Sequence, residues 1–274
     1  MIQFDVNKRS PLSGNVIGED NVLLNVADFL RKQPISISRG LYPGAEPFGS
    51  FGERLVEVAE TNYPVWPNGE IKIPPSAGVQ MSIQSTSAND DAAGTHIREL
   101  ELHYLDGNLD PATETILLSG TTAVLTTATD IRWIQCMHAH DVGANAFADG
   151  DITATYSGDT YSQIAATDTR CSSSFRRVPA GKQLFIDGAV ASSSSATADA
   201  RSTVRLVASE LDTNQYIDPL ILIPFATVSV QNGAIAANFP GLGPFSEGSI
   251  VGATQTTNKA AKVSASWFGR IENA

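Results

Sequence analysis

The chain has 274 residues and a formal net charge of −11 at pH 7, with 18 Lys and Arg against 29 Asp and Glu. Hydrophobic residues make up 42% of it, enough to bury a core, which excludes wholesale disorder. Charged residues make up only 17%, and the acidic surplus argues against nucleic acid as a partner, because binding it requires Lys and Arg to displace phosphate counterions. No apolar run approaches the ~20 residues of a membrane helix, so we expect no membrane partner either.

Residues 1–34 differ in pattern from the rest of the chain. The first nine lack the basic start and apolar stretch of a secretory signal, so we expect the protein to be made and folded in a cytoplasm. Apolar residues then recur at helical spacing after Asn21, a helix-capping residue, and before Pro34. This pattern predicts an extended arm with a short amphipathic helix of about three turns, too short to be stable alone. Either the body of the chain or a neighbouring subunit must cover its apolar face.

Six Gly and Pro residues crowd into residues 40–52, which predicts a loop. We therefore assign the arm, the helix and this loop to residues 1–60, and a single body to residues 61–274. A second irregular stretch, the Ser-rich residues 191–197, is typical of a solvated loop.

From residue 35 onward the apolar pattern has the period of two that is typical of strands. Short segments of this kind are separated by Gly, Asn, Asp and Pro, and no helical pattern lies between them. The predicted strands are 55–59, 80–86, 97–105, 114–119, 123–125, 131–138, 152–156, 173–178, 183–191, 204–209, 217–223, 226–230 and 263–270. The fold class we predict is all-β, an antiparallel sandwich or jelly roll behind the N-terminal arm.

Only one segment has the composition of a metal site, residues 136–141, with Cys136, His138 and His140 on one strand face. These three positions spread over about 13 Å of an extended strand, so one ion cannot easily gather them all. His138 and His140 alone would need further ligands, and His96 and His103 are the other imidazoles. We favour a structural role for the segment. The two cysteines, Cys136 and Cys171, are expected to be free and simply packed.

Residues 89–94 offer the short oxygen side chains of Asn89, Asp90 and Asp91 before a glycine. Their spacing does not match a calcium-binding loop, and the same residue types form ordinary Asx turns, which we favour.

Glu99 and Glu101 share a strand face at a separation that a glycosidase pair would tolerate, but carboxylates alternating with Leu are also typical of a half-exposed strand. The chain has no nucleophile elbow, phosphate-binding loop or zinc-protease motif. We therefore expect no enzymatic activity, no cofactor and no metal.

Several local patterns, taken in order, resemble a family of tailed-phage virion proteins from marine and cyanobacterial phages. They are VWPNGE at 65–70, STSANDDAAGT at 85–95, ELELHYLD at 99–106, ETILLSGTT at 114–122, GDIT at 150–153, VPAGKQL at 178–184 and VSASWFGRIE at 263–272. The resemblance implies a capsid-associated or tail-associated structural protein without catalysis. It also implies a location in the virion after assembly in the host cytoplasm.

Within that family resemblance we expect a capsid decoration or cement protein, a homotrimer that binds the major capsid protein or other virion proteins. The alternatives are a tail adaptor, fibre or receptor-binding protein and, further off, a β-sandwich carbohydrate-active enzyme that uses Glu99 and Glu101. The residues expected at the interface are apolar members of the arm and helix, together with one aromatic residue near the following turn. They are Phe4, Val22, Val26, Phe29, Leu30 and Trp66. The other possibility is that these side chains finish the chain's own core.

Overall fold

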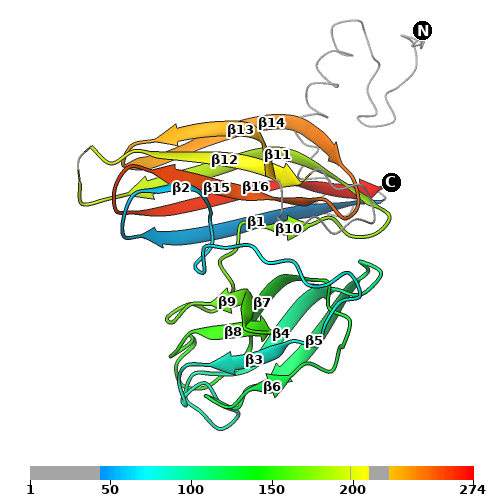
Figure 1. The fold of residues 1–274 in the computed structure, drawn as a ribbon. Coiled ribbons are helices and arrows are strands. Elements are labelled where there is room, and N and C mark those ends of the chain that lie inside the picture. Colours follow the sequence, from blue (N-terminus) through cyan, green and yellow to red (C-terminus); the bar gives the residue numbers. More distant parts are fainter. Residues whose placement is uncertain (1–43, 198, 210–221) are drawn as a thin grey trace, which may run out of the picture. The chain divides into compact units, whose positions relative to one another are not determined.

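The computed structural model describes residues 44–197, 199–209 and 222–274 (Figure 1). The chain divides into two compact units, residues 1–47 and residues 48–274. The predicted arm and helix, with Phe4, Val22, Val26, Phe29 and Leu30, lie outside the described residues, and so does most of the predicted strand 217–223. No helix within the described ranges has the length and apolarity that crossing a bilayer requires.

Every regular element in the described ranges is a β-strand, and the strands of these ranges pair antiparallel, which confirms the all-β prediction. The strands are β1 (Ala45–Val56), β2 (Glu60–Pro64), β3 (Ser82–Ser85), β4 (Ile97–Leu105), β5 (Pro111–Leu117), β6 (Val124–Leu125), β7 (Trp133–Val142), β8 (Ile152–Tyr156), β9 (Asp159–Ile164), β10 (Arg176–Arg177), β11 (Lys182–Ser194), β12 (Ser202–Ser209), β13 (Leu222–Val230), β14 (Gly233–Phe245), β15 (Ile250–Thr257) and β16 (Ala261–Asn273).

These strands form four sheets rather than the two of the single sandwich that the sequence predicts. Their orders are β1-β16-β11-β14, β10-β15-β12-β13 with β2 beside β15, β6-β3-β8-β9, and β5-β4-β7. Two of the sheets share one hydrophobic core and the other two share a second core. Alternation along a strand shows which residues point inward, but not which sheet covers them, so the number of cores was not predictable from the sequence.

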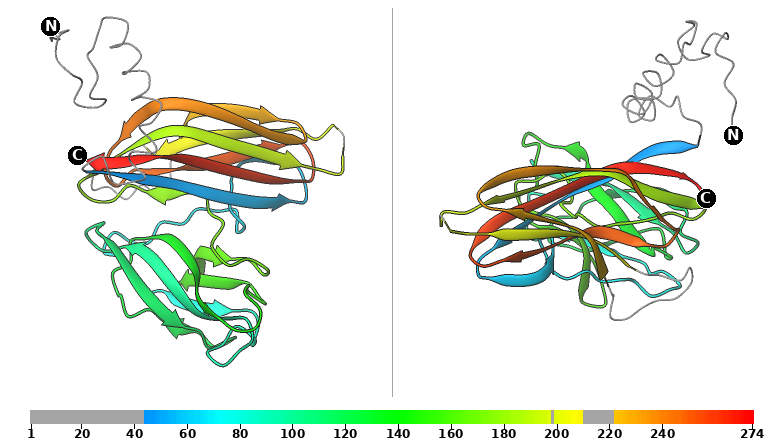
Figure 2. Two further views of the ribbon diagram at one scale, coloured as in Figure 1. Left: turned by 180° about the vertical axis from the view of Figure 1, so that it is seen from behind. Right: turned by 90° about the horizontal axis from the view of Figure 1, so that it is seen from above.

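The first core lies between the sheet that contains β11 and β16 and the sheet that contains β12 and β15 (Figures 1 and 2). Inward residues of β11 alternate with outward ones, as the predicted period of two requires. Trp267 of β16 is fully buried in this core, where its indole Nε1 donates to the carbonyl of Ser174 at 2.7 Å. A buried indole usually finds such an acceptor, and this bond holds the residue 174 segment against the sheet.

The second core contains the inward residues of β3, β4, β7 and β8. Leu100 and Leu102 of β4 and Met137 of β7 are fully buried there, while the residues between them face outward. The predicted strand 97–105 matches β4 at both ends.

Parts of the two predicted loops, 40–52 and 191–197, are strands. Residues 45–52 belong to β1, where Gly52 serves a close approach: a Cβ there would lie 2.2 Å from the carbonyl oxygen of Val65. Residues 191–194 belong to β11, where the hydroxyls of Ser193 and Ser202 pair at 2.8 Å, and those of Ser192 and Ser264 at 2.6 Å. Glycine and serine content therefore predicted the wrong structure at both places. In β1 the missing Cβ of Gly52 lets another backbone segment approach, and in β11 the serine hydroxyls form hydrogen bonds with neighbouring strands.

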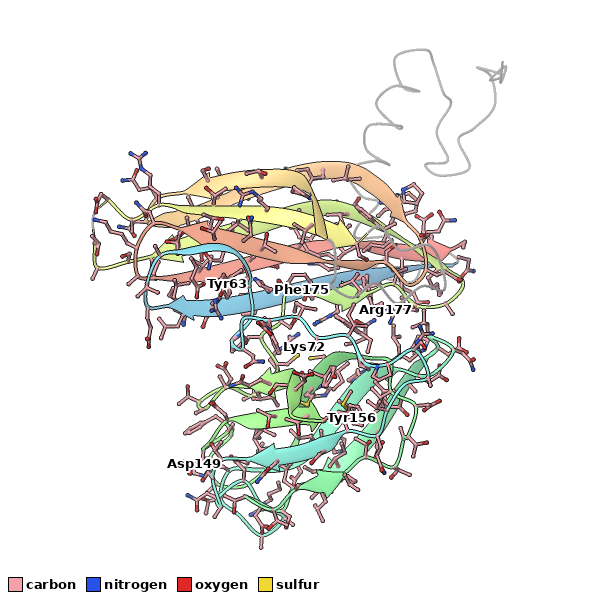
Figure 3. All side chains as sticks on the ribbon, viewed as in Figure 1. Tyr63, Lys72, Asp149, Tyr156, Phe175 and Arg177 are labelled. Carbon is pink, nitrogen blue, oxygen red and sulfur yellow. The ribbon has the colours of Figure 1, made fainter. Side chains whose placement is uncertain are left out.

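A third, smaller cluster surrounds Phe175, one of the largest fully buried side chains of the chain. It includes Leu105 of β4, Trp133 of β7, Val207 of β12 and Ile250 of β15. Figure 3 labels Phe175 and the nearby Arg177, whose guanidinium Nε donates to the carbonyl of Gly248 at 3.1 Å.

We predict that Gly252→Ala destabilises the protein by about 1–3 kcal/mol, the usual cost of overpacking a core. A Cβ at Gly252 would lie 2.3 Å from Cδ1 of Phe175, so the ring has to move. Urea unfolding of the variant measures the loss. The double variant with Phe175→Leu is expected to lose less than the sum of the two single changes, and strict additivity would contradict this contact.

Candidate functional site

Strand register brings a group of histidine and glutamate side chains to the outer face of the β5-β4-β7 sheet. Glu101 of β4 lies directly opposite His138 of β7, and His103 lies opposite Cys136. Directly opposite residues of an antiparallel pair point to the same side of the sheet, and so do residues two apart on one strand. The intervening Leu100, Leu102 and Met137 fill the core, so Glu101, His103 and His138 face away from it.

The carboxylate of Glu101 is the centre of this group, which we call the histidine–glutamate cluster (Glu101, His103, His138 and His140). Its Oε1 lies 2.7 Å from Nε2 of His103 and 4.0 Å from Nε2 of His138. Its Oε2 lies 3.4 Å from Nδ1 of His140. The rings of His103 and His138 stack with their centroids 5.1 Å apart. One carboxylate thus faces three imidazoles that come from two strands.

A surface pocket of about 570 Å³ opens beside the cluster. Its lining residues come from β4, from β7 and from the segment that follows β9: His103, Gln135, Cys136, His138, Ala139, Thr169 and Arg170. That segment continues the sheet beyond β7, since Arg170 bridges to His138 and the amide of Ala139 donates to the carbonyl of Thr169 at 2.8 Å. The exposed Arg170 therefore places a positive charge at the pocket. Glu101 places a negative charge next to His138, another lining residue.

Both cysteines are free, and their sulfur atoms lie 3.1 Å apart. Cys171 is buried in the second core, and Cys136 is half-buried at the floor of the pocket. The hydrogen bond shared with Cys171, together with burial, raises the pKa of the Cys136 thiol. The two thiols are thus free and packed against each other, as the sequence predicts.

The structure does not bring together the side chains of Cys136, His138 and His140, which the sequence places on one strand face. Cys136 pairs with Cys171, while His138 and His140 turn to Glu101 of the neighbouring strand. His96 lies elsewhere, hydrogen-bonded with Asn145 at 3.1 Å and 3.5 Å from the carboxylate of Asp149. Glu99 and Glu101, considered as a catalytic pair, belong to the same histidine-rich face, with Glu99 3.9 Å from His140.

Asn89, Asp90 and Asp91 are each engaged by groups of the chain. The carboxylate of Asp90 is fully buried and accepts from the Ser85 hydroxyl at 2.6 Å and from three backbone amides, those of Ile97, Asp149 and Gly150, at 3.0–3.3 Å. Asp91 accepts from the amide of Ala93 at 3.0 Å, which is an Asx turn.

The amide of the Asn89 side chain donates to the carboxylate of Asp149, which Figure 3 labels, at 2.9 Å. Hydrogen bonds from Ser87 and Asn89 lower the pKa of that carboxyl. The loop is thus ordered by its own hydrogen bonds, with the Asp90 carboxylate tying residues 85, 97 and 149–150 together.

Trp66, expected at an interface, is only 2% exposed. Its side chain lies inside the chain, which is the alternative that the sequence left open, and so it has no surface to offer a neighbouring subunit.

A second surface with a distinct chemistry is the outward side of the β1-β16-β11-β14 sheet, at the middle of its length. Across β16, β11 and β14, three successive cross-strand rows contain no charged residue, and we call these rows the uncharged face. The rows are Phe268, Gly188 and Asn238; Ser266, Val190 and Ala236; and Ser264, Ser192 and Ala234. Phe268 lies over Gly188, where a Cβ would lie 2.5 Å from its ring, yet it remains 47% exposed.

Charges border the uncharged face at both ends of the strands. Lys262 pairs with Glu53 at 2.6 Å at one end, and Arg270 pairs with Asp187 at 2.8 Å at the other. On β1, Phe51 and Leu55 flank Glu53 and are 40% and 70% exposed. The sequence motif at 263–272 contains Phe268, but only the pairing with β11 shows that its ring lies outside the core.

No protein-family model and no curated protein matches the chain. Matches among solved structures include the structure of infectious bursal disease virus Gx strain, 9% identical, covering 83% of this chain and 79% of that chain with a TM-score of 0.12. Another is the infectious bursal disease virus VP2 subviral particle, 10% identical, covering 90% and 86% with a TM-score of 0.11. Scores this low carry no argument about fold or function.

We predict that Asp90→Ala destabilises the protein by about 3 kcal/mol, because it leaves several buried donors without an acceptor. Asp91→Ala, which removes one local acceptor on a half-buried residue, is the matched control and should cost less than about 1 kcal/mol. Chemical denaturation of both variants measures the difference. Equal losses would show that the buried carboxylate does not organise this loop.

Proposed function

We propose that the protein is a structural component of a phage virion that attaches to the assembled shell through the uncharged face. The observation that supports this is the composition of that face: three rows without a charge, with Val190 exposed at the centre and Phe268 exposed in the first row. Depletion of charge at the centre and charged residues at the border are typical of the core and rim of protein–protein interfaces.

The shape of the surface also suits a protein partner. The three rows lie on neighbouring strands of one sheet, so they form a continuous area rather than scattered apolar residues. Exposed aromatic and aliphatic side chains that lie together in this way mark interaction sites more often than single exposed residues do. Small side chains around them, Ser and Ala, let a second protein approach the sheet closely.

In this proposal the protein acts by binding rather than by catalysis. If it binds the assembled shell but not its separate subunits, each bound copy shifts the equilibrium toward the intact particle. The acidic net charge of −11 suits a partner surface other than the packaged genome, whose phosphates would repel it. The partners proposed are therefore the major capsid protein and further copies of this chain.

The first test places a charge at the centre of the uncharged face. Val190→Lys is expected to weaken binding to virion shells that lack the protein by at least about tenfold, because burying an unpaired charge costs more than 1.4 kcal/mol. Co-sedimentation of the purified chain with such shells measures the affinity. Leu125→Lys on β6, a residue that is 61% exposed, adds the same charge away from the face and should bind normally. Equal binding by the two variants would overturn the role of the face.

The second test concerns the arm, which stays a prediction from sequence. Removal of residues 1–34 should lower the affinity for the same shells, since an extended segment can add to the sheet edge of a neighbour. Circular dichroism first establishes that the truncated chain keeps its β-structure. Undiminished binding by that chain would then show that the arm is not an attachment device. The role of the uncharged face is tested separately by Val190→Lys. Localisation of the protein at the tail rather than over the shell would favour the tail alternative.

A further inference from the structure

We propose that Glu101, His103 and His138 form a binding site for one divalent transition-metal ion of the zinc class. The site lies on the outer face of the β4–β7 pair, apart from the uncharged face on which the proposed function rests.

The geometry of the three side chains is the first argument. One ligand atom from each of them lies within 4.8 Å of the other two. A tetrahedral ion at about 2.0–2.2 Å from its ligands separates them by roughly 3.3 Å. The distances from Oε1 of Glu101 to the two Nε2 atoms, 2.7 Å and 4.0 Å, lie on either side of that value. Side-chain rotation alone can therefore close the site, because the strand pairing already places the residues side by side.

The donor set is the second argument. Two imidazole nitrogens and one carboxylate oxygen are the ligands that zinc and its neighbours prefer, whereas calcium and magnesium take oxygen ligands almost exclusively. The carboxylate of Glu101 makes this site different from a chance pair of surface histidines. It lies between His103 and His138 and supplies the negative charge that holds the cation, while Glu99 adds a second carboxylate on the same face.

Accessibility is the third argument. The side chains of Glu101, His103 and His138 are 27%, 39% and 37% exposed, so an ion can enter from solvent, yet most of each side chain is shielded. Three protein ligands leave a fourth tetrahedral position open, and two of the three, His103 and His138, line the pocket that Arg170 also lines. The site would thus tie two strands together and still accept a small oxygen ligand from outside.

One alternative uses the same residues differently. His138 and His140 form a His-x-His pair on β7, and such a pair can chelate an ion without any help from β4. In that arrangement Glu101 and His103 would be only cross-strand partners of the histidines. The two arrangements differ in which substitutions matter.

The experiment measures Zn²⁺ binding to the full chain, free of any affinity tag and stripped with a chelator, by titration against a chromogenic competitor. We expect one ion per chain with a Kd of about 1 µM or tighter. Glu101→Gln, His103→Asn and His138→Asn should each weaken binding at least about tenfold, since even outer partners of metal ligands are worth that much. Thr115→Ala is the matched control, because Thr115 lies directly opposite Glu101 on β5 and offers no such ligand.

Circular dichroism and metal-free melting establish that each variant is folded before its affinity is compared. Binding that survives Glu101→Gln and His103→Asn but is lost in His140→Asn would overturn the proposal in favour of the His-x-His pair. Absence of one-to-one binding to the parent chain would overturn it outright. Neither result bears on shell attachment, which Val190→Lys tests separately.

Discussion

The antiparallel register of the strands is the constraint on which the rest of this structure depends. Because side chains alternate with a period of two, each pairing decides at once which residues fill a core and which share a surface. β11 shows this at the centre of its sheet, where one register with β16 buries Trp267 and sets Phe268 over Gly188 on the outside. A slip of one residue would exchange the two aromatic rings. The uncharged face and the histidine–glutamate cluster both result from such pairings.

The low charge of the chain is distributed unevenly over these surfaces. Ion pairs gather at the ends of the uncharged face, while its central rows carry only small, apolar or neutral polar side chains. The β5-β4-β7 sheet has the opposite character, with Glu99, Glu101 and three histidines on its outer side. The two sheets thus present surfaces of different chemistry, one without charge and one rich in imidazoles and carboxylates.

Much of the fold was predictable because local patterns carry it. The alternation of Leu100 and Leu102 with charged residues predicted β4 at its true ends, and the lack of helical periodicity predicted an all-β class. The predictions that were wrong rested on composition instead. Glycines and serines suggested loops at 45–52 and 191–194, but there the missing Cβ admits a neighbouring backbone, or the hydroxyls pair across strands.

The histidine–glutamate cluster shows the same division. The sequence by itself identified each member, since Glu101, His138 and His140 are chemically conspicuous and their faces follow from alternation. It treated them as two unrelated motifs, a His-x-His pair that lacked further ligands and a pair of carboxylates on another strand, because the sequence does not show that the two strands are neighbours. Only the tertiary structure decided that Glu101 lies opposite His138, and that Trp66 is buried while Phe268 is not. Which strands become neighbours depends on contacts between distant parts of the chain, and these leave no trace in the local pattern.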